Sequence, residues 1–446
     1  MTGDLSKQSI MATSSHKQPR PPLFGLVDVN NFYVSCERAF NPRLANVPVV
    51  VLSNNDGCAV ARSHEVKALG VKMGAPWFQM KELARQHGIV ALSSNYTLYG
   101  DMSNRVVSIL REFSPDTEVY SIDESFLRVE TVDHLYGGAT AMGQAMRRRI
   151  RQWTSLPVCA GFGESKTLAK LANHLAKKNL VFDGVCDLTA LTDAQRQQWM
   201  AKIEVGEVWG VGRKIAARLQ TMGIQSVLDL ATADLKLIRR QFGVVLERTV
   251  SELQGTSCLE LDDLADPKKQ IMASRSFGSM VEDLAELGEA VAWHIGRAAE
   301  KLRDQGSVAG AVYVFIQTNR FRQADPQYNP GVVVPLADVS DDTRSLTMAA
   351  LKGLRHIYRP GYSYKKCGVM LMELTAKQQR QETLFDDAAA RAKSAKLMMA
   401  MDAVNSVWGR GTLRTGAAGM SKGWAMRSEN RSPRYTTRWD ELPVAS

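Results

Sequence analysis

The chain has 446 residues, a mass of 49.2 kDa and a formal net charge of +10. With 45% hydrophobic and 23% charged residues it has the composition of a globular protein, which excludes a wholly disordered, collagenous or coiled-coil chain. We expect several domains, because a single hydrophobic core stops growing at about 250–300 residues. The basic charge is compatible with a polyanionic partner but does not identify one.

The cysteines and the N-terminus bear on the compartment of the protein. The six cysteines are scattered without a Cys-x-x-Cys pair, which favours reduced thiols in the cytoplasm over a disulfide framework or a zinc site. No apolar run approaches the roughly 18 residues of a membrane span. Residues 1–22 are polar and lack the apolar centre of a secretory signal, so we expect a flexible N-terminal extension.

Residues 23–185 alternate predicted strands and helices, as an α/β domain does. β-type runs are predicted at residues 23–28, 47–52, 118–129 and 158–163. Helical spacing is found at residues 62–70, 78–88, 101–113, 139–153 and 165–178. The cluster Ser53–Gly57 between two of these elements predicts a turn.

The rest of the chain divides into a helical part, a second mixed part and a polar tail. Residues 190–255 carry no strand signal and predict a small helical unit, followed by a linker at 256–270. A second α/β unit is indicated by β runs at 271–278, 309–318 and 366–374 and by helices near 286–304 and 341–358. The tail from residue 377 is polar, with a short helix near 391–404.

Three acidic residues stand at the ends of two predicted strands. Asp28 ends the first strand, and Asp123 with Glu124 follows Val-Tyr-Ser-Ile. If the strands are neighbours, these carboxylates converge and repel one another unless cations are present. An all-oxygen set of this kind suits Mg²⁺, which in pairs serves nucleotidyl transfer. The alternative is that the three acids are ordinary turn residues.

A glycine-rich hairpin occurs within the predicted helical unit. Gly210 and Gly212 flank one apolar residue, and Arg213 and Lys214 begin the next helix, where Ala217 is small enough for close helix packing. Glycines allow backbone amides to approach a phosphate closely, and a helix N-terminus favours anions. The pattern predicts a helix-hairpin-helix that binds the DNA backbone, against the alternative of an ordinary helical hairpin.

Other candidate contacts are less specific. Lys170 and Lys177 are seven residues apart on one predicted helix and share a face that can reach phosphate, whereas the basic run 147–151 is interpreted as a solvated face. Arg275 lies on a predicted exposed strand, Ser274–Gly278, whose amides can follow a phosphate backbone. In the tail, Gln381 followed by Leu384 and Phe385 suits a peptide that inserts two apolar anchors into a groove.

Several of these segments together resemble the Y-family of translesion DNA polymerases. The resemblance covers roughly residues 23–440 and is carried by Asp28–Tyr33, Ser53–Cys58, Lys67–Gly74, Tyr120–Glu124 and Lys166–Asn173. Residues 384–387 and 432–438 are similar to the UmuC branch, the catalytic subunits of bacterial DNA polymerase V and their mobile-element relatives.

The resemblance implies an α/β multidomain right hand. Its expected parts are the N-terminal extension 1–22, a palm at 23–31 and 98–185, small fingers at 32–97, a thumb with the helix-hairpin-helix at 186–255, a linker at 256–270, a little finger at 271–375 and a partner-binding tail at 376–446. Small fingers would check the nascent base pair loosely, which implies low fidelity and tolerance of damaged templates.

The resemblance also assigns roles in the active site. Asp28, Asp123 and Glu124 are implied as catalytic ligands of two Mg²⁺ ions, with the backbone carbonyl of Val29 as a further oxygen. Tyr33 is implied as the steric gate that excludes a ribose 2′-hydroxyl.

Further residues are implied in nucleotide binding. Phe32 is expected to pack near the sugar, and Lys177 to contact the incoming triphosphate. On the fingers, Ala61, His64 and Lys67 stand where the family often supplies Thr, Tyr and Arg, so of these only Lys67 is carried over as a contact.

The implied function is error-prone translesion synthesis during SOS mutagenesis: template-directed transfer of dNMP from dNTP to a primer 3′-hydroxyl. Implied partners are primer–template DNA, a cleaved UmuD-like homodimer, RecA and the β sliding clamp, the last through Gln381, Leu384 and Phe385, at the bacterial nucleoid. A nucleotide cyclase would not need the helix-hairpin-helix, and a non-catalytic DNA-binding accessory protein would not need all three acids.

Overall fold

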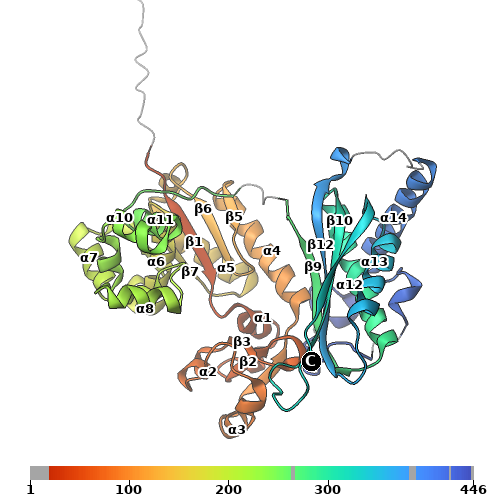
Figure 1. The fold of residues 1–446 in the computed structure, drawn as a ribbon. Helices are drawn as coiled ribbons and strands as arrows, with labels where there is room; N and C mark the ends of the chain where they lie inside the picture. The colour runs from red at the N-terminus through yellow and green to blue at the C-terminus, as the bar shows by residue number, and fades with distance from the viewer. Residues whose placement is uncertain (1–19, 263–266, 381–387, 421–422, 443–446) are drawn as a thin grey trace, which may run out of the picture. The chain divides into compact units, whose positions relative to one another are not determined.

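The computed structural model describes residues 20–262, 267–380, 388–420 and 423–442. The chain divides into two compact units, each built from separate stretches of sequence (Figure 1). Unit 1 comprises residues 1–45, 96–263 and 434–446, and unit 2 comprises residues 46–95 and 264–433. Among the helices of the described ranges, none combines the length and the apolar character needed to span a bilayer.

Unit 1 is built on a five-stranded sheet with the order β5-β6-β1-β7-β8. Its strands are β1 (Phe24–Val29), β5 (Thr117–Val119), β6 (Glu124–Arg128), β7 (Val158–Gly163) and β8 (Val185–Asp187). The central strand β1 is antiparallel to both β6 and β7, while β7 is parallel to β8. Every residue of β1 is buried, which fits its uninterrupted apolar run up to Asp28.

Helices cover both faces of this sheet. They are α4 (Tyr96–Phe113) and α5 (Ala139–Thr154) on one face and α6 (Lys166–Lys178) on the other, while α1 (Phe32–Phe40) packs on α4. Gly143 of α5 packs on the Phe162 ring, and the neighbouring residue of β7, Gly161, faces α6. A Cβ at Gly161 would lie 2.1 Å from the Asn173 backbone nitrogen, so only glycine permits this approach of α6 to the sheet.

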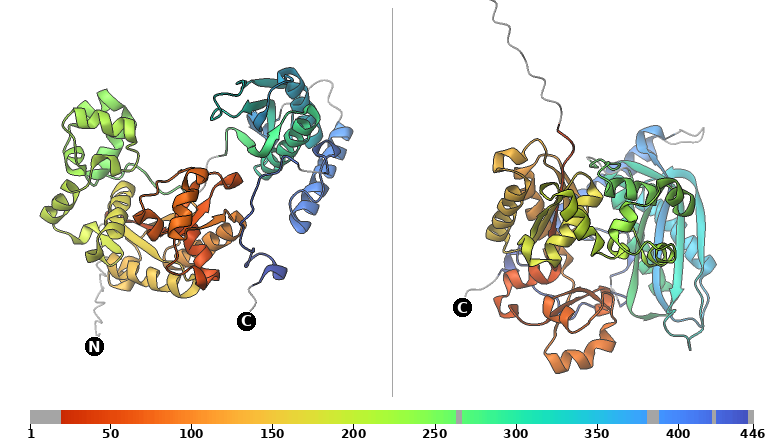
Figure 2. Two further views of the ribbon diagram at one scale, coloured as in Figure 1. Left: turned by 90° about the horizontal axis from the view of Figure 1, so that it is seen from below. Right: turned by 90° about the vertical axis from the view of Figure 1, so that its left-hand side faces the viewer.

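Residues 193–253 form the helical group predicted from the sequence (green in Figure 2). Its helices are α7 (Asp193–Ala201), α8 (Arg213–Thr221), α9 (Val227–Ala231), α10 (Leu235–Phe242) and α11 (Val244–Leu253). They share a hydrophobic core with α6, in which Leu219, Val227, Leu230 and Ile238 are fully buried. The helical group is therefore anchored on the helix that also packs against the sheet.

Within unit 2, residues 46–95 form a small three-stranded sheet with two helices. The sheet has the order β3-β2-β4, from β2 (Val49–Leu52), β3 (Ala59–Arg62) and β4 (Val90–Ser93), and the helices are α2 (His64–Ala68) and α3 (Trp77–His87). The predicted turn at Ser53–Gly57 is present, with Asn55 and Asp56 both at positive φ, 60° and 50°. The short polar side chains of Asn and Asp tolerate this conformation.

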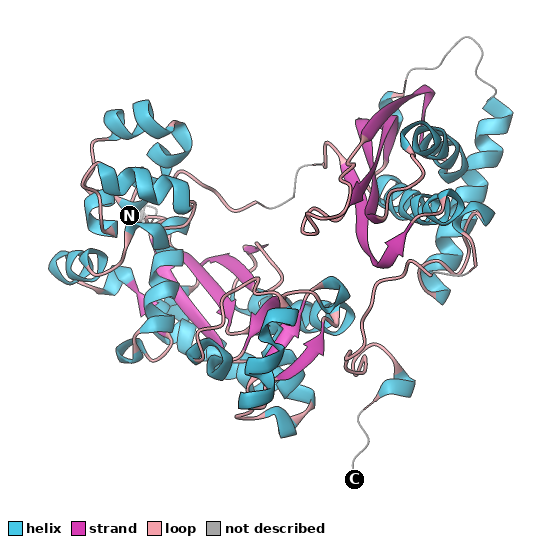
Figure 3. Ribbon diagram, turned by 60° about the horizontal axis from the view of Figure 1, so that its bottom comes forward, coloured by secondary structure: helices cyan, strands magenta, loops and turns pink. Residues whose placement is uncertain are grey.

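The larger part of unit 2 is a four-stranded antiparallel sheet with the order β11-β10-β12-β9. Its elements are β9 (Ile271–Val281), α12 (Leu284–Asp304), β10 (Ser307–Thr318), β11 (Gly331–Ser340), α13 (Thr343–Ile357) and β12 (Tyr364–Ala376). The two helices pack together on one face of the sheet (Figure 3). Strand β11 was not predicted, because Pro335 interrupts its pattern, yet an edge strand accommodates proline.

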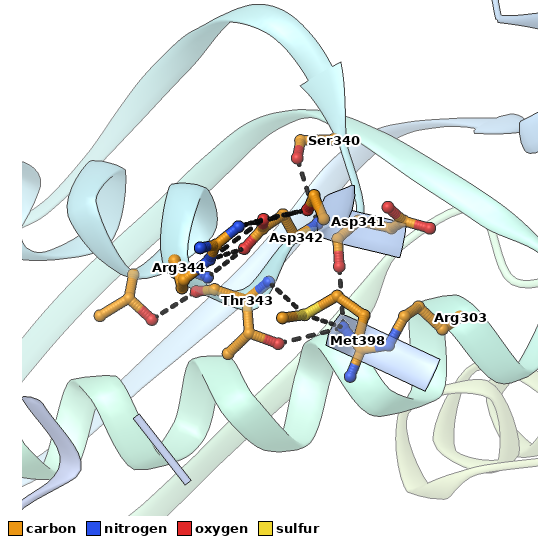
Figure 4. Close-up of polar contacts among 9 residues, drawn as sticks. Arg303, Ser340, Asp341, Asp342, Thr343, Arg344 and Met398 are labelled. Atoms are coloured by element: carbon orange, nitrogen blue, oxygen red, sulfur yellow. Dashed lines mark hydrogen bonds and ion pairs between the residues drawn. The ribbon is translucent and has the colours of Figure 1, made fainter. Parts of the chain in front are cut away.

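Much of the region predicted as a polar C-terminal tail is folded into unit 2, while its predicted role in binding partners stays a prediction. Helix α14 (Ala388–Trp408) is longer than predicted, and Arg303 of α12 holds Asp402 with two hydrogen bonds of 2.6 and 2.7 Å. Arg303 and the Thr343 backbone amide also contact the Met398 sulfur (Figure 4). Trp424, 5% exposed, lies in the core with its ring centroid 6.4 Å from that of Phe277.

Asp342 fixes the beginning of α13 beside this junction. Its carboxylate accepts hydrogen bonds from the Arg344 backbone and side chain and from the Ser394 hydroxyl of α14 (Figure 4). Burial alone would raise its pKa, but these hydrogen bonds prevail and lower the pKa of Asp342 to about 2. The carboxylate therefore caps α13 and holds α14 in its ionised form.

The segment after Trp424 joins the small sheet of unit 2. The Arg427 amide donates to Asn55 Oδ1 at 2.9 Å, and the Glu429 amide donates to Asp56 Oδ2 at 3.1 Å. Asn430 and Ser93 exchange two hydrogen bonds of 3.0 Å. Asn55 in addition donates to the Ser276 carbonyl of β9. Residues from both ends of the sequence thus complete one folded unit.

The two units do not correspond one to one with the parts implied by the resemblance, so the boundaries of palm and fingers stay predictions. Helix α1 falls in unit 1, and β8 continues to Asp187. Helix α4 begins at Tyr96 instead of near 101. Residues 434–442 belong to unit 1, where the Tyr435 ring stacks on Phe40 of α1 at 5.0 Å.

Candidate active site

The strand register of unit 1 brings the three predicted acids to one edge of the sheet. Asp28 of β1 is the direct partner of Glu124 of β6, and the Val29 amide donates to the Asp123 carbonyl at 2.9 Å. Ser121 supports this turn, because its hydroxyl donates to Asp123 Oδ1 at 2.7 Å and accepts from the Glu124 amide. The convergence expected from neighbouring strands is therefore observed.

Two lysines of α6 pair with two of the three acids. Lys177 Nζ lies 2.5 Å from Asp28 Oδ2, and Lys170 Nζ lies 3.0 and 3.1 Å from the two Glu124 oxygens. The shared face predicted for these lysines is present, but here it is turned to carboxylates. Lys166 is also unavailable to phosphate, because it is buried in an ion pair with Glu118.

The site is short of positive charge. Asp28 is 8% exposed, and burial, with smaller contributions from Glu124 and Asp123, raises its pKa to about 6 in spite of Lys177. One ammonium group thus fails to offset the burial of this carboxylate. Within the described residues, no group of three or more Asp, Glu, His or Cys side chains has the arrangement of a metal site.

The donor set nevertheless fits divalent cations. Its oxygens come from the adjoining positions Asp28, Asp123 and Glu124, and Mg²⁺ prefers carboxylates completed by substrate phosphates and water. Lys177 keeps a third of its side chain exposed, so it can leave Asp28 when another cation approaches.

A cluster of tyrosines lies beside the acids. Asn31, at φ 48°, turns the chain from β1 directly into α1, which carries the buried Phe32 and the half-buried Tyr33. The Tyr33 ring stacks on Tyr99 of α4, with centroids 4.4 Å apart. Burial raises the pKa of Tyr33, and the nearby Tyr96 and Asp123 raise it further.

Tyr96 and Tyr99 were missed in the sequence analysis. Tyr99 is fully buried and donates to Glu37 Oε1 at 2.6 Å, and Tyr96 meets the Tyr33 ring edge-on. The available signal was an aromatic pair three residues apart, which places both rings on one helical face. It was overlooked because the helix was predicted to begin after them.

A cavity of about 250 Å³ opens beside the acids within unit 1. Its lining includes Asp28, Glu124, Lys170, Lys177, His174, Glu207 and Trp209. Trp209 donates to the Tyr120 hydroxyl at 3.2 Å, and Lys170 Nζ lies 4.4 Å from the Tyr120 ring centroid. His174, taken from the sequence as non-catalytic, lies 3.6 Å from Glu207, and burial lowers its pKa.

The predicted hairpin is formed. Gly210 has φ 86° with open space at its Cβ position, and Gly212 precedes α8, whose first residues Arg213 and Lys214 are exposed. The small packing residue is Ala216, which is buried, whereas the predicted Ala217 is exposed because it lies one position further round the helix.

The remaining candidates belong to unit 2 or lie outside the described residues. Lys67 is exposed on α2, and Arg275 is exposed on β9, where it donates to the Met426 sulfur. The Gly278 amide bonds the Trp424 carbonyl, so the C-terminal segment covers part of the strand edge expected to follow a phosphate backbone. Gln381, Leu384 and Phe385 fall outside the described residues.

Sequence profiles of known families match most of the chain. The impB/mucB/samB family matches residues 27–174, its C-terminal domain matches 268–384, and its helix-hairpin-helix motif matches 193–224. A domain of unknown function, DUF4113, matches residues 395–445.

Solved structures agree on the fold. A Y-family DNA polymerase chimera, Dbh-Dpo4(243-245)-Dbh, has a TM-score of 0.59 at 19% identity and covers 79% of this chain and 99% of its own. An insertion ternary complex of Dbh DNA polymerase has a TM-score of 0.52 at 18% identity, covering 78% and 98%. The fold is that of the Y-family polymerases.

Curated relatives span nearly the whole chain. Protein UmuC of Salmonella typhimurium is 47% identical over 94% of this chain and 99% of its own length. Protein MucB of Escherichia coli is 42% identical over 95% and 100%. DNA polymerase IV of Desulfatibacillum aliphaticivorans is 26% identical over 88% and 95%. The chain belongs to the impB/mucB/samB family, as the resemblance to its UmuC branch predicted.

The raised pKa of Asp28 predicts how stability depends on pH. The folded protein holds this proton more tightly than the unfolded chain, so the contribution of Asp28 to stability is lost as the pH rises from about 4 to about 6. In EDTA at about pH 8 we expect Asp28→Asn to raise the free energy of unfolding by about 1–3 kcal/mol, measured by urea titration.

The gain should disappear below the ordinary aspartate pKa of about 4, where Asp28 is neutral in both the folded and the unfolded state. Asp338→Asn, at an exposed position, serves as the matched control and should leave stability unchanged. A less stable Asp28→Asn protein at high pH would contradict the conclusion that this carboxylate is short of positive charge.

Proposed function

We propose that this chain is an error-prone translesion DNA polymerase that transfers dNMP from dNTP to a primer 3′-hydroxyl on a template strand. The observation that carries the proposal is the pairing of Asp28 with Glu124, with Asp123 joined to the same strand end, beside a cavity short of positive charge. Membership of the impB/mucB/samB family supports the same activity.

Asp28, Asp123 and Glu124 would hold two Mg²⁺ ions, with the Val29 carbonyl as a further ligand. When bound, the ions supply the charge that activates the primer hydroxyl and stabilises the pyrophosphate leaving group. The chain itself positions the reactants, which is the main requirement of an in-line displacement. Ser121 contributes by fixing the Asp123 carboxylate.

Lys177 then changes partner. In the absence of nucleotide it pairs with Asp28, and its exposed fraction lets it turn toward the triphosphate of an incoming dNTP. Tyr33 acts as the steric gate, with its ring held by the Tyr99 stack where a ribose 2′-hydroxyl would otherwise fit. Phe32 is 3% exposed, so it supports the gate from the protein interior.

The primer–template duplex is bound by elements other than those that carry Asp28, Asp123 and Glu124. The exposed Arg213 and Lys214, next to the amides of Gly210 and Gly212, suit sequence-independent contact with phosphates. Arg275 and Lys67, both exposed on unit 2, are assigned further contacts with the DNA backbone and the triphosphate.

The proposed partners are a cleaved UmuD-like homodimer, RecA and the β sliding clamp, in the bacterial cytoplasm at the nucleoid. The similarity to UmuC and MucB supports this assignment. The clamp contact is assigned to Gln381, Leu384 and Phe385, whose spacing suits insertion of two apolar anchors into a groove.

Asp123→Ala should abolish primer extension, because the carboxylate at this position is needed to hold metal at the primer terminus. The affinity for primer–template should stay within about fivefold of wild type, since phosphate contacts dominate DNA affinity. Gel-based extension and fluorescence anisotropy measure the two quantities. Normal extension by the variant would refute the assignment.

Tyr33→Ala should let ribonucleotides in while DNA synthesis continues, because the ring that excludes the 2′-hydroxyl is gone. The readout is the ratio of kcat/KM for dNTP to that for the matching rNTP, which we expect to fall by about tenfold or more. Tyr136→Ala, a tyrosine of unit 1 away from the cluster, is the control. Unchanged sugar discrimination would exclude Tyr33 as the gate.

Replacement of Leu384 and Phe385 by alanine should remove the stimulation of synthesis by the β clamp and spare distributive synthesis without it. Leu413→Ala, at an exposed leucine elsewhere in the C-terminal region, is the control. A clamp response equal to that of wild type would show that this motif is not the tether.

A further inference from the structure

The connection between β10 and β11 presents a bare aromatic ring to solvent. Phe321 is 90% exposed and stands between Arg320 and Arg322, which are also exposed. Single exposed apolar residues are common on protein surfaces and need no function by themselves. Phe321 differs from such residues in two ways: hydrogen bonds fix the loop that carries it, and positive charges surround it.

The loop Asn319–Tyr328 is held by one side chain. The Gln327 amide nitrogen donates to the carbonyls of Asn319, Arg322 and Asp325 at 3.2, 3.0 and 3.1 Å. Its oxygen accepts from the Thr318 hydroxyl at 2.9 Å, and the Phe321 amide donates to Asn319 Oδ1 at 3.1 Å. The outward position of Phe321 is thus set before any ligand arrives, which lowers the entropy cost of binding.

The base of the loop is fixed to the end of α13. Tyr328 donates its hydroxyl proton to the Ile357 carbonyl at 2.9 Å, and its ring packs on Tyr362 with centroids 4.9 Å apart. The Arg359 guanidinium lies 4.8 Å from the same ring. The loop therefore belongs to the rigid scaffold of the sheet and its helix.

The surroundings of the loop are positively charged. Burial lowers the pKa of Lys365, and the nearby charges of Arg427 and Arg322 lower it further, so these three cations repel one another. The acid facing Arg322 is Asp325, at a distance of 3.8 Å. An anionic ligand would relieve this repulsion, which favours a polyanion over an apolar or basic partner.

We propose that the Asn319–Tyr328 loop binds single-stranded nucleic acid, with Phe321 stacked on an unpaired base and Arg320 and Arg322 on the flanking phosphates. Aromatic rings bind any base through its π face, and arginines follow the backbone. A duplex offers no such face along its length, because its bases are already stacked. The inference rests on the proposed polymerase function, in which the template ahead of the primer is single-stranded.

The test uses the full chain and two probes, a fluorescent oligothymidylate and a blunt hairpin duplex. Phe321→Ala should weaken oligothymidylate binding by about tenfold, since one stacked base contributes about 1–3 kcal/mol, and leave duplex binding within about twofold. Phe321→Trp should restore or exceed wild-type affinity. Phe78→Ala, which removes another exposed phenylalanine of unit 2, should change neither.

The salt dependence of binding distinguishes the contribution of the two arginines from that of the Phe321 ring. Arg320→Ala and Arg322→Ala should each reduce the slope of log affinity against log salt by about one, whereas Phe321→Ala should leave the slope unchanged. Equal affinity of Phe321→Ala and wild type for oligothymidylate would overturn the proposal, as would an equal loss for both probes, which would assign Phe321 to folding or to another macromolecule.

The two proposals fail in different ways. If wild type extends primers and Phe321→Ala binds oligothymidylate normally, the loop assignment is wrong and the polymerase assignment stands. If wild type extends no primer while Phe321→Ala still loses oligothymidylate affinity selectively, the loop binds single strands in a protein that is not a polymerase.

Discussion

The arrangement of unit 1 depends on the burial of the Asp28 carboxylate opposite Glu124. Like charges at directly paired strand positions destabilise a sheet unless cations lie between or beside them. Here α6 supplies Lys177 and Lys170, and its backbone approaches β7 closely at Gly161 and Gly163, where a Cβ would collide with the helix. The glycines of β7 therefore contribute to the electrostatics at the C-terminal end of β1.

The same constraint shapes the entrance to the site. Strand β1 passes directly into α1 through Asn31, which has a left-handed backbone conformation. Asp28 and Tyr33 are therefore separated by only a few residues along the chain. Tyr99, buried and bonded to Glu37, connects α4 to α1 beneath the gate ring. The three acids and the Tyr33 ring, to which we assign metal binding and sugar discrimination, are thus carried by neighbouring elements of unit 1.

Much of this was predictable, and the exceptions have physical reasons. Strand β1, helix α6, the hairpin at Gly210 and the three acids follow from local patterns, and the family predicted from the motifs is confirmed. The pairing of Lys170 and Lys177 with carboxylates was not predictable, because it depends on strand register and on how closely α6 docks. The folded C-terminal region was interpreted as a tail, since Trp424 stands among glycine and polar residues, and the helix predicted near 391–404 gave no sign of the surface on which it packs.

The hydrogen bonds between Ser93 and Asn430 have a consequence for folding during synthesis. The two residues are separated by 337 positions, so the ribosome must add all the intervening residues before the small sheet meets the segment that completes it. At about 5–20 residues per second this interval is roughly 20–70 s. During that time strands β2 to β4 are without their C-terminal partner, a window in which chaperones or proteases compete with folding for the nascent chain.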